Sequence, residues 1–277
     1  MVGIVVVSHS RPLALAAVAL AAEMLTGPRP RIEVAAGLGE GSSGEAVLGT
    51  DALAIAAAIM AADDGEGVLV LMDLGSAVLS AQLALELVED HRIRDRVLLC
   101  PAPLVEGLVV AVVAAAVGAP RDQVAAEAIA ALAGKQDQLA AAGPEPQPWV
   151  EPAGQLRVEP EGELRVEPAG ELRARPEVEP NANEVRATFT VVNPNGLHAR
   201  PAARLVQALR GIDAGVELRD LTTGAGPVPA GSLALLATLG AALGHRIEVT
   251  ATGARAAQAV ALVLELARTG FGESAGG

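Results

Sequence analysis

The sequence predicts two domains of mixed α/β structure joined by a Pro-rich linker. Up to about residue 135, short β-branched runs alternate with longer Ala- and Leu-rich runs. Residues 136–183 are acidic and rich in Pro, and strands and helices return from residue 184 onward. The length of 277 residues fits two domains, because domains usually contain about 100–200 residues.

The first domain is expected over residues 1–135. Its strands are predicted at 2–7, 31–35, 67–73 and 96–100. Its helices are predicted at 11–25, 51–62, 76–90, 104–118 and 121–135. The strands are nearly continuous apolar runs, which is typical of a sheet covered by helices on both faces. Alternation of strand and helix therefore predicts a doubly wound parallel sheet.

The linker over residues 136–183 contains an eight-residue repeat. Three copies, EPAGQLRV, EPEGELRV and EPAGELRA, start at Glu151, Glu159 and Glu167. A small solenoid is the alternative, but copies this short and this poor in apolar residues bury no core. An extended acidic linker is the favoured interpretation.

The second domain is expected over residues 184–272, followed by a tail at 273–277. Strands are predicted at 184–192, 214–220, about 221–228 and 245–253. Helices are predicted at 199–211, 230–244 and 254–269. The order βαββαβα joins some strands without a helix, so an α+β open-faced sandwich with an antiparallel sheet is expected.

Composition excludes several function classes. The net charge is -13 and aromatic residues make up 1% of the chain, which argues against nucleic-acid binding. One cysteine, Cys100, gives no disulfide framework and no Cys-based zinc site, and no metal is expected. The start of the chain lacks a basic region before Arg11-Pro12, and the apolar run 108–117 is too short to span a bilayer. A cytoplasmic protein without membrane insertion is expected.

His9 follows the first predicted strand, where open α/β sheets bind ligands. Asp73 ends the third strand at the same edge, and a carboxylate beside a histidine fixes its tautomer. Phosphate suits helix N-termini and Gly-rich loops, such as 37–44. The supporting residues at this edge are Ser10, Thr50, Asp73, Gly75 and Ser76. The pattern fits a nucleophilic histidine that accepts a phosphoryl group, but also a histidine that merely closes a strand.

His198 stands in NPNGLHARPAARLV, between a glycine turn and Arg200-Pro201. Pro201 suits the first turn of a helix, so His198 lies at or just before the N-cap. The helix dipole there favours a bound dianion, and Arg200 can add charge-assisted hydrogen bonds to it. The pattern fits a phosphorylatable imidazole, while a purely capping histidine is the alternative.

The remaining histidines have simpler interpretations. His91 lies in a charged segment and is expected to be solvated, and His245 follows Gly244 at a helix-strand turn, where a structural role is expected. Ser8 and Ser10 flank His9, but the G-x-S-x-G signature of a serine hydrolase is absent from the sequence.

These motifs carry a family resemblance. The stretch GLHARPA and the later AGSLALLATLGAALGHRIEVTATG resemble the phosphocarrier HPr of the phosphoenolpyruvate-dependent phosphotransferase system, over residues 184–272. Residues 1–135 resemble the mannose-class IIA domain through GIVVVSHS, LGTD and VLVLMDLGSA. DLGSA and PLVEG resemble most closely the phosphotransferase subunit of phosphoenolpyruvate-dependent dihydroxyacetone kinases.

The resemblance implies a phosphohistidine relay. His198 and His9 would be the phosphorylated residues, Arg200 would assist His198, and Asp73 would hydrogen-bond His9. Enzyme I and HPr would supply the phosphoryl group, and ADP on the nucleotide-binding kinase subunit would receive it, with dihydroxyacetone on a third subunit. Because the sequence ends without a domain similar to enzyme I, a separate enzyme I is expected.

The resemblance also implies a homodimer through the IIA domain and no cofactor beyond the phosphohistidines. It leaves alternatives open. The chain could be a IIA-HPr component of a mannose-class sugar transporter, or a regulatory module that signals by its phosphorylation state. Ser232 lies where the HPr of some bacteria carries a regulatory serine, with Gly231 in place of the usual preceding lysine.

Overall fold

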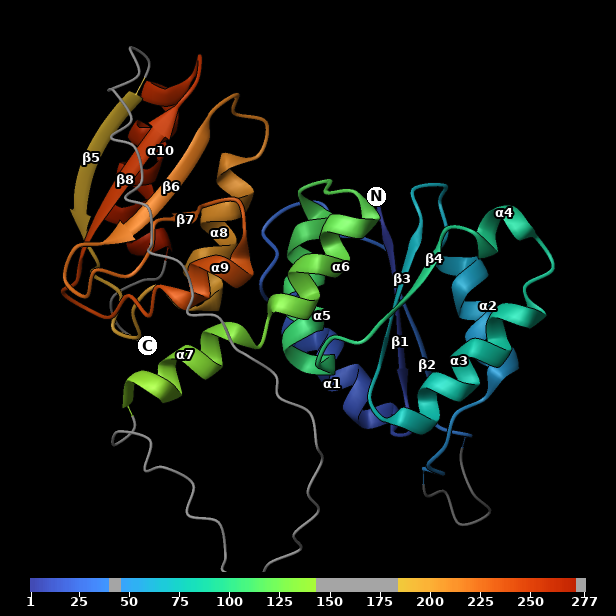
Figure 1. The fold of residues 1–277 in the computed structure, drawn as a ribbon. Helices are drawn as coiled ribbons and strands as arrows, with labels where there is room; N and C mark the ends of the chain where they lie inside the picture. Colours follow the sequence, from blue (N-terminus) through green and yellow to red (C-terminus); the bar gives the residue numbers. More distant parts are fainter. Residues whose placement is uncertain (40–45, 143–183, 273–277) are drawn as a thin grey trace, which may run out of the picture.

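The computed structural model describes residues 1–39, 46–142 and 184–272. The eight-residue repeats and the tail at 273–277 lie outside these ranges. Figure 1 shows two sheet-containing units side by side, with the N-terminal one at the right and the C-terminal one at the left.

The N-terminal domain is built on a parallel sheet of four strands in the order β2-β1-β3-β4. The strands are β1 (Gly3–Ser8), β2 (Ile32–Ala36), β3 (Val68–Met72) and β4 (Val97–Cys100). Every residue of β1 and β3 is buried. The sheet confirms the predicted parallel arrangement and places the carboxyl ends of β1 and β3 next to each other.

Helices cover both faces of this sheet (Figure 1). The helices of residues 1–142 are α1 (Arg11–Ala22), α2 (Ala52–Ala62), α3 (Gly75–Leu87), α4 (His91–Arg94), α5 (Leu104–Ala116), α6 (Arg121–Ala130) and α7 (Ala133–Ala142). Of these, α1, α5 and α6 cover one face of the sheet, and α2 and α3 cover the other. Ile4 and Val6 point into the core formed with α1, α5 and α6. Val5 and Val7 point into a separate core formed with α2 and α3. Alternation along β1 therefore gives the domain two cores, one on each face of the sheet.

Two helices differ from the sequence prediction. The single helix expected over 121–135 is interrupted after Ala130, and α7 then runs from Ala133 to Ala142, into the stretch expected as linker. The reason is a tertiary contact, because α7 packs against α9 of the second domain. His91, expected in a charged loop, begins the short helix α4, whose N-cap Asp90 accepts from the amide of Arg92 at 2.8 Å.

The C-terminal domain has an antiparallel sheet in the order β5-β8-β6-β7. Its elements are β5 (Glu184–Thr190), α8 (Ala199–Leu209), β6 (Gly215–Asp220), β7 (Val228–Pro229), α9 (Leu233–Thr238), β8 (Arg246–Thr252), α10 (Ala256–Arg268) and the 3-10 turn η1 (Gly270–Gly272). This order confirms the predicted βαββαβα domain. Its core contains Leu205, Leu218, Leu236, Ile247 and Phe271.

Two elements of this domain are shorter than predicted. The helix expected over 230–244 comprises only α9, because the chain turns at Gly240, where φ is +56°. The carbonyl of Ala241 then accepts from the amide of Leu197 at 2.8 Å. The strand expected near 221–228 is limited to β7, because the carboxylate of Asp220 holds the preceding residues in a turn.

The turn before His198 depends on Gly196. Its φ is +72°, and an added Cβ would lie 2.3 Å from the carbonyl oxygen of Ala241. Because left-handed backbone costs other residues about 1–2 kcal/mol and the clash adds to this, Gly196→Ala is expected to destabilise the domain by about 2–3 kcal/mol. Hydrogen exchange of the C-terminal strands measures this. Gly231→Ala is the matched control, since its Cβ meets nothing within 4 Å. Equal effects of the two variants would contradict the prediction.

Candidate functional site

His9 lies between a strand and a helix at the carboxyl edge of the parallel sheet. β1 ends at Ser8, and Ser10 caps α1 by accepting from the amide of Leu13 at 3.4 Å. Asp73 follows β3, the neighbour of β1 in the sheet. The amide of Asp73 donates to the carbonyl of Val7 at 3.2 Å, which continues the pairing of the two strands up to the site.

Asp73 holds both the ring and the backbone of His9. Its Oδ1 lies 2.9 Å from His9 Nδ1. Its Oδ2 accepts from the His9 amide at 2.9 Å and from Ser8 Oγ at 2.9 Å. The amide of Leu74 donates to Oδ1 at 2.7 Å. Four donors thus converge on one carboxylate, whose side chain is 10% exposed.

The electrostatics keep this carboxylate ionised. Burial acts to raise the pKa of Asp73, but the hydrogen bonds from the His9 ring, the His9 amide and Ser8 outweigh burial. The pKa of Asp73 therefore lies below its ordinary value. An ionised carboxylate only accepts hydrogen bonds, so the proton between the two side chains belongs to Nδ1 of His9.

This proton leaves the other ring nitrogen with its lone pair. His9 Nε2 lies 2.9 Å from Ser76 Oγ, and a neutral imidazole protonated at Nδ1 accepts a hydrogen bond there. Ser76 is the second residue of α3, directly after Gly75. Nε2 therefore points to the N-terminal end of a helix, where an anion is stabilised, and the His9 side chain is 23% exposed. The arrangement presents a nucleophile beside a place for an anion.

The other predicted supporting residues have different surroundings. The hydroxyl of Thr50 pairs with Ser80 Oγ at 2.7 Å. The loop before α2 reaches His9 through Gly49, whose amide donates to the His9 carbonyl at 3.0 Å. Ser10 serves as the cap of α1. The structure thus brings Asp73 and Ser76 to the ring of His9, and brings Gly49 to its backbone.

Ser8 is a residue whose role sequence reasoning missed. It is fully buried, and its hydroxyl donates to Asp73 while accepting from the amide of Ser10 at 3.0 Å. Buried in this way, it orients the carboxylate and is not an exposed nucleophile. The available signal was a polar residue at the end of an otherwise apolar strand.

His198 is the N-cap residue of α8, and its side chain is exposed without making the capping hydrogen bond. Pro201 is buried in the first turn, as the sequence predicted. Arg200 points toward the first domain, where Nη2 lies 3.5 Å from Glu23 Oε2. His198 thus stands at the N-terminus of an eleven-residue helix, two residues before Arg200.

A second histidine-carboxylate pair, His245 with Asp220, fits the structural role expected for His245. Asp220 is fully buried and His245 Nδ1 lies 2.7 Å from its Oδ2. Asp220 also accepts from the amides of Thr222 and Thr223. Burial acts to raise the pKa of Asp220, but these hydrogen bonds lower it overall. The carboxylate of Asp220 therefore stabilises the turn at Thr222 and Thr223 and fixes the ring of His245.

Within residues 1–39, 46–142 and 184–272, no group of three or more His, Cys, Asp and Glu side chains forms a possible metal site. Over the same residues, no helix combines the length and the apolar character that crossing a membrane requires.

Comparison with known proteins finds one family model for each domain. Residues 3–125 match the model for the PTS system fructose IIA component, and residues 185–269 match the PTS HPr component phosphorylation site. The chain belongs to the phosphotransferase-system family and joins a IIA domain to an HPr domain. His9 lies in the IIA match and His198 in the HPr match.

The chain is also similar to individual proteins of this system. The chain is 38% identical over 273 residues to the PEP-dependent dihydroxyacetone kinase, phosphoryl donor subunit DhaM, of Pantoea ananatis, covering 99% of this chain and 51% of that protein. It is 34% identical over 276 residues to the same subunit of Escherichia coli K12, again covering 51% of it. Phosphocarrier protein NPr of Escherichia coli K12 is 42% identical over 90 residues, which are 32% of this chain and 97% of NPr. The chain spans about half the length of the DhaM relatives.

Proposed function

We propose that this protein is a phosphohistidine relay of the phosphotransferase system. Enzyme I, charged by phosphoenolpyruvate, phosphorylates His198 directly or through a free HPr. The phosphoryl group then passes to His9, and from His9 to ADP on the nucleotide subunit of a dihydroxyacetone kinase. The overall activity is that of a cytoplasmic phosphoenolpyruvate-glycerone phosphotransferase.

The geometry at His9 is the observation that carries this proposal. Asp73 accepts from Nδ1, so Nε2 is the nitrogen that carries the lone pair, and Ser76 and the start of α3 face it. In the transfer, the bond from phosphorus to a ring nitrogen of His198 breaks as the bond to His9 Nε2 forms. In the next step the His9 bond breaks, and an oxygen of the β-phosphate of ADP receives the phosphoryl group.

The protein's part in these steps is positioning and electrostatics, as in other phosphoryl transfers. His9 keeps its Nδ1 proton throughout, and the ionised carboxylate of Asp73 accepts a hydrogen bond from it. Ser76 Oγ is placed to donate to a phosphoryl oxygen once Nε2 is phosphorylated. Arg200, near the start of α8, offers charge-assisted hydrogen bonds to a phosphoryl group on His198. The relay as proposed needs no metal and no bound cofactor.

The names of the DhaM relatives support dihydroxyacetone kinase as the acceptor system. The description of the matching IIA model names a sugar component instead. A IIB protein of a sugar transporter is therefore the second candidate acceptor. A homodimer through the IIA domain remains a prediction, which gel filtration of the full chain tests.

The experiment uses the full chain with phosphoenolpyruvate, enzyme I and HPr. We expect phosphate on the protein that is acid-labile and alkali-stable, as N-phosphohistidine is. We then expect transfer to purified kinase subunits with ADP, and little transfer to a IIB protein. His198→Ala should slow labelling of His9, and added HPr should restore it in part. Transfer to the IIB protein alone would replace dihydroxyacetone kinase by a transporter, and absence of label would reject the relay.

A further inference from the structure

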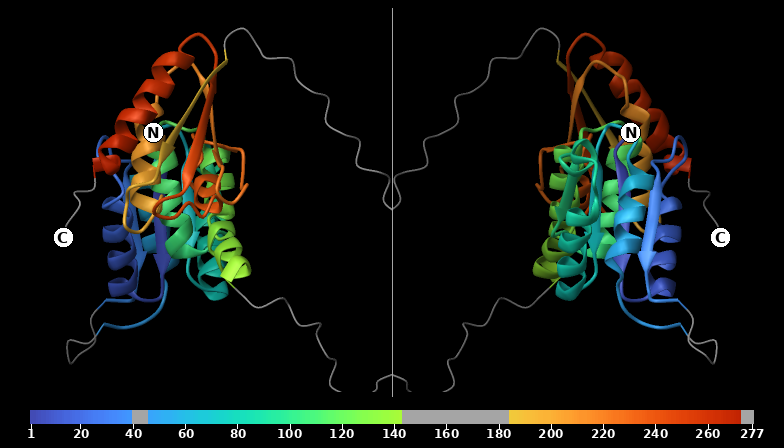
Figure 2. Two further views of the ribbon diagram at one scale, coloured as in Figure 1. Left: turned by 90° about the vertical axis from the view of Figure 1, so that its left-hand side faces the viewer. Right: turned by 90° about the vertical axis from the view of Figure 1, so that its right-hand side faces the viewer.

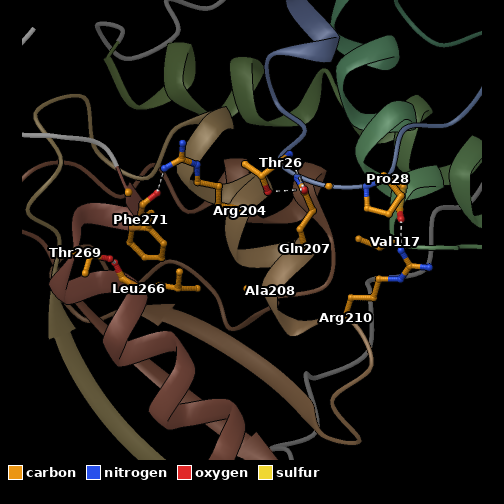
Figure 3. Close-up of a pocket in the computed structure, with 13 residues that line it drawn as sticks. Thr26, Pro28, Val117, Arg204, Gln207, Ala208, Arg210, Leu266, Thr269 and Phe271 are labelled. Carbon is orange, nitrogen blue, oxygen red and sulfur yellow. Dashed lines mark hydrogen bonds between the residues drawn. The ribbon is translucent and has the colours of Figure 1, made fainter.

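The two domains contact each other through one helix of the HPr domain in particular, α8. Gln207 Oε1 accepts from the amide of Thr26 at 3.1 Å and from its hydroxyl at 3.0 Å, and Gln207 Nε2 donates to the carbonyl of Met24 at 2.8 Å. Arg210 Nη1 donates to the carbonyl of Ala116 at 2.6 Å. Figure 3 shows Gln207 of α8 and Arg210, the C-cap residue that follows α8, reaching to the first domain.

A second contact lies at α9. Glu127 of α6 accepts from Ser232 Oγ at 2.7 Å and from the amide of Ala234 at 3.4 Å. Ser232 is the N-cap of α9 and is 5% exposed. A carboxylate therefore sits at the N-terminal end of α9, where a negative charge is favoured.

A third contact joins α7 to α9. An added Cβ at Gly134 would lie 2.7 Å from the Cβ of Ala237, so the two helices approach as closely as glycine allows. Figures 1 and 2 show the C-terminal domain against the α1, α5 and α6 side of the first domain. The docked arrangement is thus defined by contacts at α8, at α9 and at α7.

His9 faces away from this interface. Its Nε2 points to Ser76 of α3, and α3 belongs to the layer on the opposite face of the sheet. The HPr domain packs against α5 and α6, and a helix is about 10 Å thick. Arg200, two residues after His198, pairs with Glu23 beyond the end of α1, whereas His9 precedes the start of α1. Phosphoryl transfer needs reacting atoms about 3–3.5 Å apart.

We infer that this docked arrangement is a resting state that does not transfer, and that the HPr domain leaves it before His198 can reach His9. The inference rests on the proposed function only for the transfer step. The contacts between the domains do not depend on the transfer step. Together with the relay, they imply an equilibrium between a docked and an undocked chain.

The interface has the properties of a reversible one. A cavity of about 390 Å³ remains between the domains, lined by residues of both, including Pro28, Val117 and Ala208 (Figure 3). Unfilled volume forfeits packing energy, and interfaces between domains of one chain commonly permit relative motion. Residues 143–183, which connect the domains, have a maximum extended length of about 140 Å, so the chain length permits release.

Cross-linking across the cavity measures docking. Gly27 and Ala208 both line it, and a Cβ at Gly27 meets nothing within 4 Å, so Gly27→Cys with Ala208→Cys introduces two thiols without removing an interface hydrogen bond. Cys100 is buried and burial raises the pKa of its thiol, so it reacts slowly. The chain with Cys100 alone is the control.

With a short bismaleimide, we expect rapid intramolecular cross-linking of the two-cysteine chain. Glu127→Lys should slow it about tenfold, because the buried Ser232 hydroxyl loses a charged acceptor. Glu127→Gln, which keeps an acceptor oxygen, should cross-link nearly normally. Glu127→Lys combined with Ser232→Asp should recover the rate, since Asp also caps helices well. Gly134→Leu should slow cross-linking independently. The docked arrangement would be overturned if the two-cysteine chain without further substitutions cross-linked slowly, or if all the variants built on it cross-linked at the same rate.

The cross-linked chain tests whether docking blocks transfer. Transfer within one chain is the part of the His198-to-His9 rate that does not depend on protein concentration. We expect this part to fall about 100-fold or more when the chain is locked, and to be normal in the same two-cysteine chain before cross-linking. An unchanged rate in the locked chain would overturn the resting state. Failure of the chain to be phosphorylated even before cross-linking would reject the proposed function instead, while the cross-linking rates would still decide the docking.

Discussion

Replacement of His9 by alanine or glutamine is expected to abolish phosphoryl delivery to the acceptor while leaving His198 able to accept phosphate. His9 Nε2 is the proposed nucleophile; Asp73 contacts the other ring nitrogen, and Ser76 contacts Nε2 itself. Glutamine is close to histidine in size but has no basic nitrogen. The loss should therefore be as complete with glutamine as with alanine, which separates the chemical role of His9 from its packing.

The measurement is acceptor phosphorylation at saturating enzyme I and HPr, with bound label followed in parallel. In the His9 variants, label should accumulate on the chain at His198 and stay there. His91→Ala is the matched control, because His91 begins α4 and is exposed. Acceptor phosphorylation at the parent rate in His9→Gln would remove His9 from the relay and leave His198 as the donor.

The sequence contained enough information to predict much of the site at His9. The carboxyl ends of parallel strands lie at one edge, so His9 and Asp73 could be placed together before the strand order was known. Their direct contact depends on β1 and β3 being neighbours, which alternation of strand and helix alone does not specify. The role of Ser8 is harder to predict from sequence, because its hydroxyl donates a hydrogen bond to Asp73, a residue that is distant in sequence.

The parts that sequence could not predict depend on tertiary contacts. Ala- and Leu-rich composition favours helix through residue 244, yet α9 ends at Thr238. The chain turns at Gly240, and the carbonyl of Ala241 then accepts from the Leu197 amide. Likewise, α7 continues into a stretch of linker-like composition because it packs on α9. The Glu127–Ser232 contact joins residues of different domains, and neither residue's periodicity or propensity indicates its partner.

Asp73→Asn is expected to reduce phosphorylation of His9 by up to about 10,000-fold, the loss associated with an orienting carboxylate whose replacement leaves a reactive histidine in the wrong tautomer. The amide can turn its NH₂ toward Nδ1, which then becomes the acceptor and moves the ring proton to Nε2. Rotated the other way, it turns its NH₂ toward the His9 amide and Ser8 hydroxyl, both of which donate to Asp73 in the native site. Nε2 therefore loses its lone pair, or the histidine loses its position.

The same substitution should change stability in a pH-dependent way. Because the pKa of Asp73 is lowered in the folded protein, its stabilising effect is fully present above the unfolded value of about 3.9 and is lost as pH falls through the lower folded value. At neutral pH, Asp73→Asn should reduce the free energy of unfolding of the first domain by about 1–3 kcal/mol. The difference from the parent chain should shrink below about pH 4.

Chemical denaturation at pH 7 and at stepwise lower pH, with circular dichroism as the signal, measures this difference. Asp90→Asn is the matched control, since Asp90 caps α4 by accepting from the Arg92 amide and asparagine caps a helix equally well. That variant should change neither phosphorylation nor the pH profile. If the free energy of unfolding of Asp73→Asn stays below that of the unsubstituted chain by the same amount from pH 7 to pH 3, the ionised carboxylate is not the source of the lost stability. Normal phosphorylation of His9 in this variant would show that the tautomer of His9 is set without Asp73.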